Sequence, residues 1–310
     1  MENQEKKHKR RVRYSGAYPK NYREKYKELQ PEKYADTISK VIQKGSTPAG
    51  MHLSICVKEI LDFLKIQPGQ TGLDATLGYG PDILTVMLQN FADIDQVAEE
   101  TGKFDFVLAD LGVSSMQIDN PDRGFSYKTE GPLDLRMNPK KGISAAQRLK
   151  DISVEEFQGM LMENADEPYA QEIAWEVTDR LRRGEEIATT TQLRQAIEAA
   201  LSFIPEKERR EAVKKSSQRT FQALRIDVNN EYEALYSFLE KLPEVLAPNG
   251  RVAILTFHSG EDRLVKKSFK RLKKEGVYSE IADEVIRPSA EECLRNGRAR
   301  STKMRWAVKA

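Results

Sequence analysis

Three side chains that can carry chemistry stand at the ends of strand-like runs in this sequence. Asp74 and Asp110 each close an apolar run, and His258 directly follows a third. In open α/β sheets, ligands bind beyond the carboxyl ends of the strands. Carboxylates and an imidazole gathered there can hold a polar ligand and exchange protons with it. We therefore expect a functional site where the three runs end, at residues 71–74, 104–110 and 251–257.

A loop that contains glycines follows the first of these runs. Gly78 and Gly80 close the stretch Gly72-Leu-Asp-Ala-Thr-Leu-Gly-Tyr-Gly80. Glycine lets a ligand approach the backbone closely, and this pattern is typical of the first strand and loop of a doubly wound nucleotide-binding domain. A plain turn is the alternative, because glycines often follow a short apolar run.

The composition restricts the kind of protein. With 39% hydrophobic and 32% charged residues, the 310-residue chain suits a globular protein with a highly charged surface. No apolar run reaches the length of about 18 residues that a membrane span needs, and the basic N-terminus lacks the apolar core of a secretory signal. Cys56 and Cys293 lie far apart, which favours a reducing, cytoplasmic compartment. The three histidines are too scattered for a zinc site, so no metal is expected.

The densest basic patch lies at the start of the chain. Lysines and arginines alternate with tyrosines in residues 1–25. Such an arm can bind RNA phosphates and stack on bases, or it can be a solvated tail, and the sequence leaves both open. Apolar residues four apart predict a short helix over residues 31–45, and a linker follows over residues 45–50.

A helical segment interrupts the strand-bearing part of the chain. Apolar residues between 142 and 216 recur at helical spacing, as in the stripe formed by Ala170, Ile173, Ala174, Val177 and Leu181. Capping-box patterns begin at Ser153 and at Thr189. Beyond the insert, we expect a helix over residues 230–246 and a last edge strand over residues 304–308. The predicted organisation is a basic arm with a short helix (1–45), a first α/β part (46–141), an all-helical insert (142–216) and a second α/β part (217–310).

Several longer motifs follow one another in a fixed order along the chain. With them, the chain from about residue 46 to its end resembles the bacterial 16S rRNA cytosine N4-methyltransferases, the RsmH or MraW family. The basic arm resembles the N-terminal extension of a paralogous branch of that family. The motifs are Asp110-Leu-Gly-Val-Ser-Ser-Met-Gln117, Arg123-Gly-Phe-Ser-Tyr127, Gly131-Pro-Leu-Asp-Leu-Arg-Met137, Arg219-Thr-Phe-Gln-Ala-Leu-Arg225 with Val228-Asn229 and Glu231, Phe257-His-Ser-Gly-Glu-Asp-Arg263 and Arg298-Ala-Arg-Ser301.

The resemblance implies a class I methyltransferase fold, a Rossmann-like doubly wound sheet, in which the helical insert recognises the substrate. It implies S-adenosylmethionine as the methyl donor and a cytosine in the 16S rRNA of the small ribosomal subunit as the acceptor. It leaves a homodimer open. The cofactor-binding residues that it implies are Asp74, Gly78, Gly80, Phe91, Asp110 and Gln117.

The implied reaction transfers a methyl group from a sulfonium to an exocyclic amine, whose lone pair is delocalised into the ring. A side chain that accepts hydrogen bonds from the amine would localise that pair and help to remove a proton. Asp110 is the expected catalytic carboxylate, although cofactor binding competes for it, and His258 is the alternative acceptor. Five arginines could hold phosphates or a splayed base, or could sit in structural ion pairs with Asp134 or Glu261. These arginines are Arg123, Arg136, Arg219, Arg225 and Arg263.

The chain departs from the family pattern in three respects. Pro81 and Asp82 stand where the family has a glycine and then a histidine, and Gly260 replaces an apolar residue. The larger departure follows the glycine loop, because Phe91 arrives too soon for a helix, a second strand with its ribose-binding acid, and another helix. Residues 83–88 are instead predicted to be the strand before Phe91, so that the sheet lacks one strand and its helices.

This shortening predicts weak or absent binding of S-adenosylmethionine. Asp93 and Asp95 are poor replacements for the ribose acid, because they follow Phe91, where the family begins its next helix. The alternative function is a non-catalytic RNA-binding or ribosome-assembly protein derived from the enzyme. A dinucleotide-dependent enzyme is a weaker alternative, because the full Gly-x-Gly-x-x-Gly pattern is absent.

Overall fold

The computed structural model of the protein describes Glu32 and residues 54–76 and 84–310. Residues Ser54–Ala310 form one compact unit. The predicted basic arm, the helix over 31–45, the linker and the glycine loop with Gly78, Gly80, Pro81 and Asp82 lie outside the described residues. Within the described part of the chain, no helix is long and apolar enough to cross a membrane.

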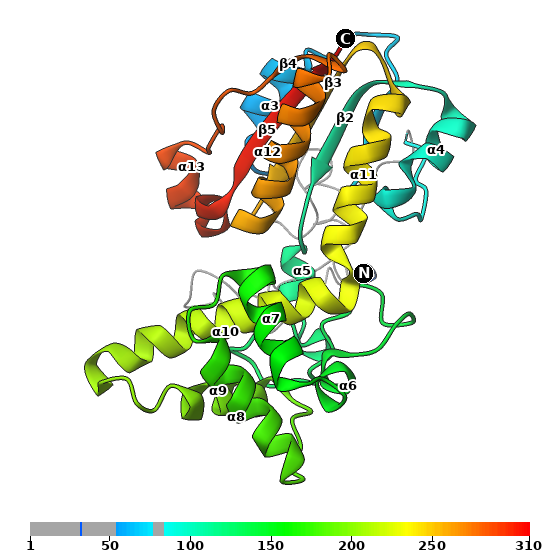
Figure 1. Cartoon of the computed structure of the whole chain (residues 1–310). Helices are drawn as coiled ribbons and strands as arrows, with labels where there is room; N and C mark the ends of the chain where they lie inside the picture. The colour runs from blue at the N-terminus through cyan, green and yellow to red at the C-terminus, as the bar shows by residue number, and fades with distance from the viewer. Residues whose placement is uncertain (1–31, 33–53, 77–83) are drawn as a thin grey trace, which may run out of the picture. The chain divides into compact units, whose positions relative to one another are not determined.

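A mixed β-sheet is the centre of the α/β part, with five strands in the described residues (Figure 1). β1 (Gly72–Asp74), β2 (Phe104–Asp110) and β3 (Leu246–Thr256) run parallel, so the strands predicted at all three runs are confirmed. β5 (Lys303–Lys309) pairs antiparallel with both β3 and β4 (Tyr278–Ile281). The prediction that the C-terminal strand lies at the edge is wrong, because the short strand β4 covers its outer side.

The predicted strand over residues 83–88 is also wrong for its described part. Residues 84–88 form no strand, and Leu84, Val86 and Leu88 are exposed. Asn90 then caps the short helix η2 (Phe91–Asp93) by accepting from the Ala92 N–H at 3.0 Å. Among the described strands β1 pairs only with β2, so the sheet ends at β1 with an open edge. Apolar residues alone thus do not make a strand.

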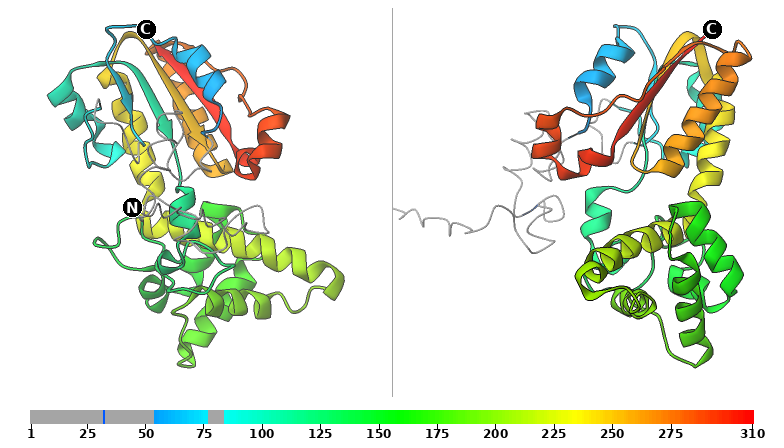
Figure 2. Two further views of the ribbon diagram at one scale, coloured as in Figure 1. Left: turned by 180° about the vertical axis from the view of Figure 1, so that it is seen from behind. Right: turned by 60° about the vertical axis from the view of Figure 1, so that its left-hand side comes forward.

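Helices cover both faces of the sheet (Figure 2). α3 (Val57–Leu64) packs on one face. α4 (Ile94–Thr101), α11 (Glu231–Val245) and α12 (Ser259–Lys274) pack on the other. Because successive strand residues point to opposite faces, the buried residues of β3 divide between two cores. Val252 and Ile254 face α11 and α12, whereas Ala253 and Leu255 face α3.

The insert is helical, as predicted, and has a core of its own. The buried stripe of α8 and the capping box at Thr189 are confirmed. At Ser153 the side chain accepts from the Glu156 N–H, but the reciprocal bond of a capping box is not formed. The predicted boundary after residue 216 falls inside one continuous helix, α10. The helices are α6 (Ala145–Lys150), α7 (Val154–Ala165), α8 (Ala170–Arg182), α9 (Thr190–Ala200) and α10 (Glu206–Asn229).

One side chain joins the two places where the chain enters and leaves the insert. Asn229, the last residue of α10, accepts from the Met137 N–H at 2.6 Å. Its amide nitrogen donates to the Leu135 carbonyl at 2.8 Å and to the Arg225 carbonyl at 2.8 Å. The incoming and outgoing segments are therefore held together by a single carboxamide.

Candidate active site

Thr76 links the ends of the first two parallel strands. Its N–H and its hydroxyl both donate to Asp74 Oδ1, each at 2.9 Å. The Asp110 N–H in turn donates to Thr76 Oγ1 at 2.8 Å. The two strand-end aspartates are thus brought together as the sequence predicted. Thr76 was missed, although an aspartate followed two residues later by a threonine is a signal of a local side-chain turn.

Asp110 lies exposed at the end of β2, yet protein atoms crowd its carboxylate. This crowding, together with the negative charges of Asp74 and Glu261, raises the pKa of Asp110 to about 6. A carboxylate with such a pKa can change its protonation state near neutral pH, which is what a proton acceptor in catalysis requires.

His258 and Glu261 form the neighbouring part of the site at the end of β3. His258 Nε2 lies 3.2 Å from Glu261 Oε1, and the Phe257 N–H donates to Glu261 Oε2 at 2.9 Å. Burial would raise the pKa of Glu261, but His258 and the Phe257 N–H outweigh it and lower that pKa. Glu261 was one of two plausible partners for an arginine, and the structure places it beside His258.

Glu231 lies near His258 and Glu261, so that one ligand atom from each falls within 4.8 Å of the others. Both oxygens of Glu231 are already bound by Arg225, at 2.7 and 2.9 Å. Glu261 is bound by the Phe257 N–H. These partners already satisfy the carboxylates, which favours an ion-pair network over a metal site.

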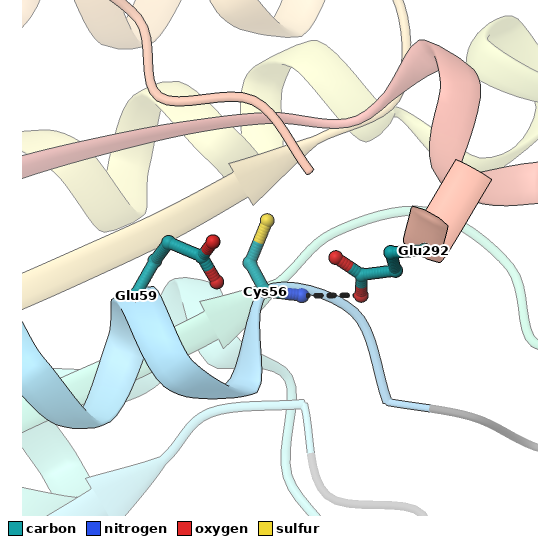
Figure 3. Close-up of side chains that lie close together, drawn as sticks. All are labelled: Cys56, Glu59 and Glu292. Carbon is teal, nitrogen blue, oxygen red and sulfur yellow. Dashed lines mark hydrogen bonds between the residues drawn. The ribbon is translucent and has the colours of Figure 1, made fainter. Parts of the chain in front are cut away.

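A second close group of side chains lies at the start of α3 (Figure 3). The Cys56 N–H donates to Oε1 of Glu292, in α13 (Ala290–Arg295), at 2.9 Å, and Glu59 lies in the first turn of α3. Burial, Glu292 and Glu59 raise the pKa of Cys56 to about 12. The raised pKa keeps the Cys56 thiol protonated and unreactive near neutral pH. Glu292 caps α3 from the C-terminal segment.

The remaining described residues of the implied cofactor site take part in local structure. The Phe91 ring packs edge-on against Phe238 of α11, with ring centroids 5.3 Å apart. Gln117 Oε1 accepts from the Ser114 N–H at 2.8 Å, within the capping box of α5 (Ser115–Asp119). Asp95, one of the poor candidates for the ribose acid, is bound by Lys241 at 2.8 Å.

Three of the five predicted substrate arginines are engaged within the protein. Arg136 binds both oxygens of Asp134, each at 2.7 Å, which confirms the open alternative of an ion pair with that residue. Arg225 binds Glu231. Arg123 Nη2 donates to the carbonyls of Arg136 and Met137, each at 2.7 Å. These contacts give each guanidinium a structural role.

Arg219 and Arg263 are held more loosely. Arg219 Nη1 lies 3.9 Å from Glu167, and its side chain is 38% exposed. Arg263 Nη2 lies 3.3 Å from Asp166, and its side chain is 52% exposed. The side chains of Arg263 and Asp166 are both exposed, and such pairs contribute little to stability, so Arg263 can exchange its partner for an RNA phosphate at low cost. The Glu167 side chain is fully buried, so Arg219 leaves its partner at a higher cost.

Comparison with known proteins identifies the family. Residues 79–310 match the model of the MraW methylase family. The chain belongs to this family. Its α/β sheet with a helical insert is therefore a class I methyltransferase fold, and family membership implies a methyl-donor cofactor.

Curated relatives of this MraW-family chain align over most or all of its length. "Ribosomal RNA small subunit methyltransferase H 1" of Lachnoclostridium phytofermentans is 66% identical, over 100% of this chain and 95% of its own. "Ribosomal RNA small subunit methyltransferase H 2" of Alkaliphilus metalliredigens is 60% identical, over 100% of both chains. "Ribosomal RNA small subunit methyltransferase H" of Koribacter versatilis is 35% identical, over 83% of this chain and 94% of its own.

These alignments also contain an internal gap. The alignment with the Alkaliphilus relative takes in both whole chains over 349 positions, whereas this chain has 310 residues, so at least 39 internal positions hold no residue of it. The family match begins at residue 79, just after β1, and the described sheet ends at β1. The alignments thus show positions that this chain lacks, and their place after the glycine loop stays a prediction.

Proposed function

We propose that this protein transfers a methyl group from S-adenosylmethionine to N4 of a cytosine in the 16S rRNA of the small ribosomal subunit. Family membership and the names of the relatives support this function. The structural observation that carries it is Asp110, a carboxylate at the end of β2 with its pKa raised to about 6. We place the reaction in the cytoplasm, where the small subunit is assembled.

Asp110 performs the central step in this proposal. When bound, S-adenosylmethionine supplies an electrophilic methyl group on a sulfonium. Asp110 accepts a hydrogen bond from the cytosine amine, which localises the nitrogen lone pair, and takes up the proton released as the amine reacts. Asp74 adds negative charge that favours the sulfonium. His258, held beside Glu261, is the alternative acceptor.

Positioning of the RNA falls to the basic side chains that the fold leaves available. Arg219 of α10 and Arg263 of α12 are the guanidinium groups proposed to hold phosphates beside the reacting base. The target cytosine must leave its base stack to reach the site. The helical insert, which has its own core, would supply a rigid surface that holds the RNA while the base is displaced. The basic arm over residues 1–25 would add non-specific affinity for the RNA.

Methyl transfer to purified small subunits that lack the modification tests this function. The full chain is incubated with labelled S-adenosylmethionine, and the RNA is digested for N4-methylcytidine. We expect product with the wild type and with the exposed control Asp283→Ala, and none with Asp110→Ala. Tight RNA binding by the wild type without methyl transfer would refute the enzyme and favour a non-catalytic RNA-binding or ribosome-assembly role.

The internal gap makes cofactor affinity a separate question. If the gap removes the ribose-binding part of the site, isothermal titration should show weak binding of S-adenosylmethionine, whereas no binding at all would refute the enzyme. A dissociation constant in the micromolar range would contradict this expectation and show that the remaining strand-end residues suffice.

A further inference from the structure

Gly260 of α12 leaves a space that the side chain of Tyr232 fills. A Cβ atom at position 260 would lie 1.8 Å from Tyr232 Oη and 2.7 Å from its Cζ. Gly260 does not have a positive φ angle, so its backbone would accept another residue. Glycine is therefore required here for space alone, and the residue that takes the space is a tyrosine of α11.

The same tyrosine lies beside His258. The two ring centroids are 6.1 Å apart, and the Cβ position at residue 260 would be 3.3 Å from His258 Nδ1. His258 Nε2 is near Glu261 but poorly aligned for a hydrogen bond, and Nδ1 is buried with no hydrogen-bond partner among the described residues. Packing, more than hydrogen bonding, therefore holds the imidazole in place.

The hydroxyl of Tyr232 extends this contact to the helical insert. It donates to the Asn164 carbonyl at 3.1 Å, in the last turn of α7. Asp166, just beyond that turn, accepts from Ser259 Oγ at 3.2 Å and pairs with Arg263. Burial and the nearby Glu261 raise the pKa of Tyr232 to about 12, so the phenol keeps its proton. The end of α7 thus touches the starts of α11 and α12.

We propose that Tyr232 is a positioning residue for His258. Its ring, seated in the space left by Gly260, holds the imidazole against Glu261, and its hydroxyl fixes the ring to the insert. The helices proposed to meet the RNA thereby determine where an imidazole sits at the strand ends. The catalytic part of this inference rests on the proposed function, whereas the contact between Tyr232 and His258 does not.

The alternative is a purely structural role, in which Tyr232 only fills space between helices. Tyr232→Ala would then lower stability and leave kcat and the environment of His258 unchanged. If Tyr232 positions His258, Tyr232→Ala and Gly260→Ala should each lower kcat roughly ten- to a hundredfold, because a small misplacement near reacting groups has effects of that size. The KM for the RNA should change much less. Tyr236→Ala is the matched control, since Tyr236 lies on the same helix and is 61% exposed.

A double substitution shows whether Gly260→Ala acts through its clash with Tyr232 or through a general packing defect. In the Tyr232→Ala background the ring is gone, so adding Gly260→Ala should lower kcat no further. Tyr232→Phe keeps the ring and loses only the bond to Asn164, so its kcat should lie between those of the wild type and Tyr232→Ala. It also serves as the test variant if Tyr232→Ala does not fold.

Imidazole NMR gives a readout that does not depend on activity. The chain has three histidines, so the His258 signals can be assigned by their loss in His258→Gln. We expect these signals to move in Tyr232→Ala and Gly260→Ala, and to stay in Tyr236→Ala. Unmoved signals together with additive effects on kcat would overturn the proposal. If the wild type transfers no methyl group but the signals move, the proposed function fails and the positioning role stands.

Discussion

The ion pair between Arg225 and Glu231 joins α10 to α11, and we expect its loss to be among the costlier single changes. Arg225 Nε and Nη2 donate to the two carboxylate oxygens at 2.7 and 2.9 Å, and the side chains are only 15% and 10% exposed. Glu231→Gln leaves the guanidinium in place without its countercharge. Removing one partner of a buried pair costs about 3–5 kcal/mol. Glutamine keeps one acceptor oxygen, so we expect the lower end, about 3 kcal/mol.

Urea unfolding of the full chain, followed by circular dichroism, measures this cost. The matched control is Glu291→Gln, which removes an ion pair with Arg295 whose side chains are both 71% exposed. We expect the control to change the free energy of unfolding by less than about 0.5 kcal/mol, because exposed pairs contribute little. The slope of the transition should stay the same in both variants. If Glu231→Gln changes stability no more than the control, the pair is not structural and Arg225 regains its predicted role toward RNA.

Three further predictions concern single side chains. The pKa of Asp110 rises from its ordinary value of 3.8 to about 6, so the folded protein loses stability as the pH rises through this window. Asp110→Asn should therefore raise the melting temperature above pH 6, leave it unchanged below pH 4, and abolish methyl transfer. Gly159→Ala in α7 should raise the free energy of unfolding by about 0.5–1 kcal/mol in urea titrations, because a Cβ there meets nothing within 4 Å and glycine disfavours helix; unchanged stability would contradict this. A thiol reagent followed by peptide mass analysis should modify the half-buried Cys293 in the folded protein and spare Cys56, whose buried thiol has its pKa raised to about 12; early labelling of Cys56 would contradict its burial.

The sequence predicted best those elements whose own residues decide their structure. Residues 104–110 form a strand because an apolar run of that length suits a strand covered on both faces. The stripe of α8 buries four of its five predicted residues, Leu181 being partly exposed, because helical periodicity specifies a single face. Residues 84–88 are also rich in apolar side chains, yet they form no strand and leave Leu84, Val86 and Leu88 exposed, so an apolar run alone does not specify a strand.

Contacts between distant parts of the chain were less predictable. Asp110 and His258 could be placed at strand ends, because parallel strands end at the same edge of the sheet. Two contacts depend on how the helices pack and could not be predicted. Glu261 lies beside His258, and Tyr232 of α11 occupies the space of a side chain at residue 260 of α12. No periodicity in the sequence encodes such a contact between two helices.

The carboxamide of Asn229 has a consequence for the history of this fold. Because it binds both Leu135 and Met137, the chain crosses into the insert and back again within the reach of one side chain. A segment whose two ends meet can be acquired, lengthened or exchanged without rerouting the strands of its host. The insert is thus attached to its host at a single place. It could be exchanged for another substrate-binding segment without any change in the strand order of the methyltransferase sheet.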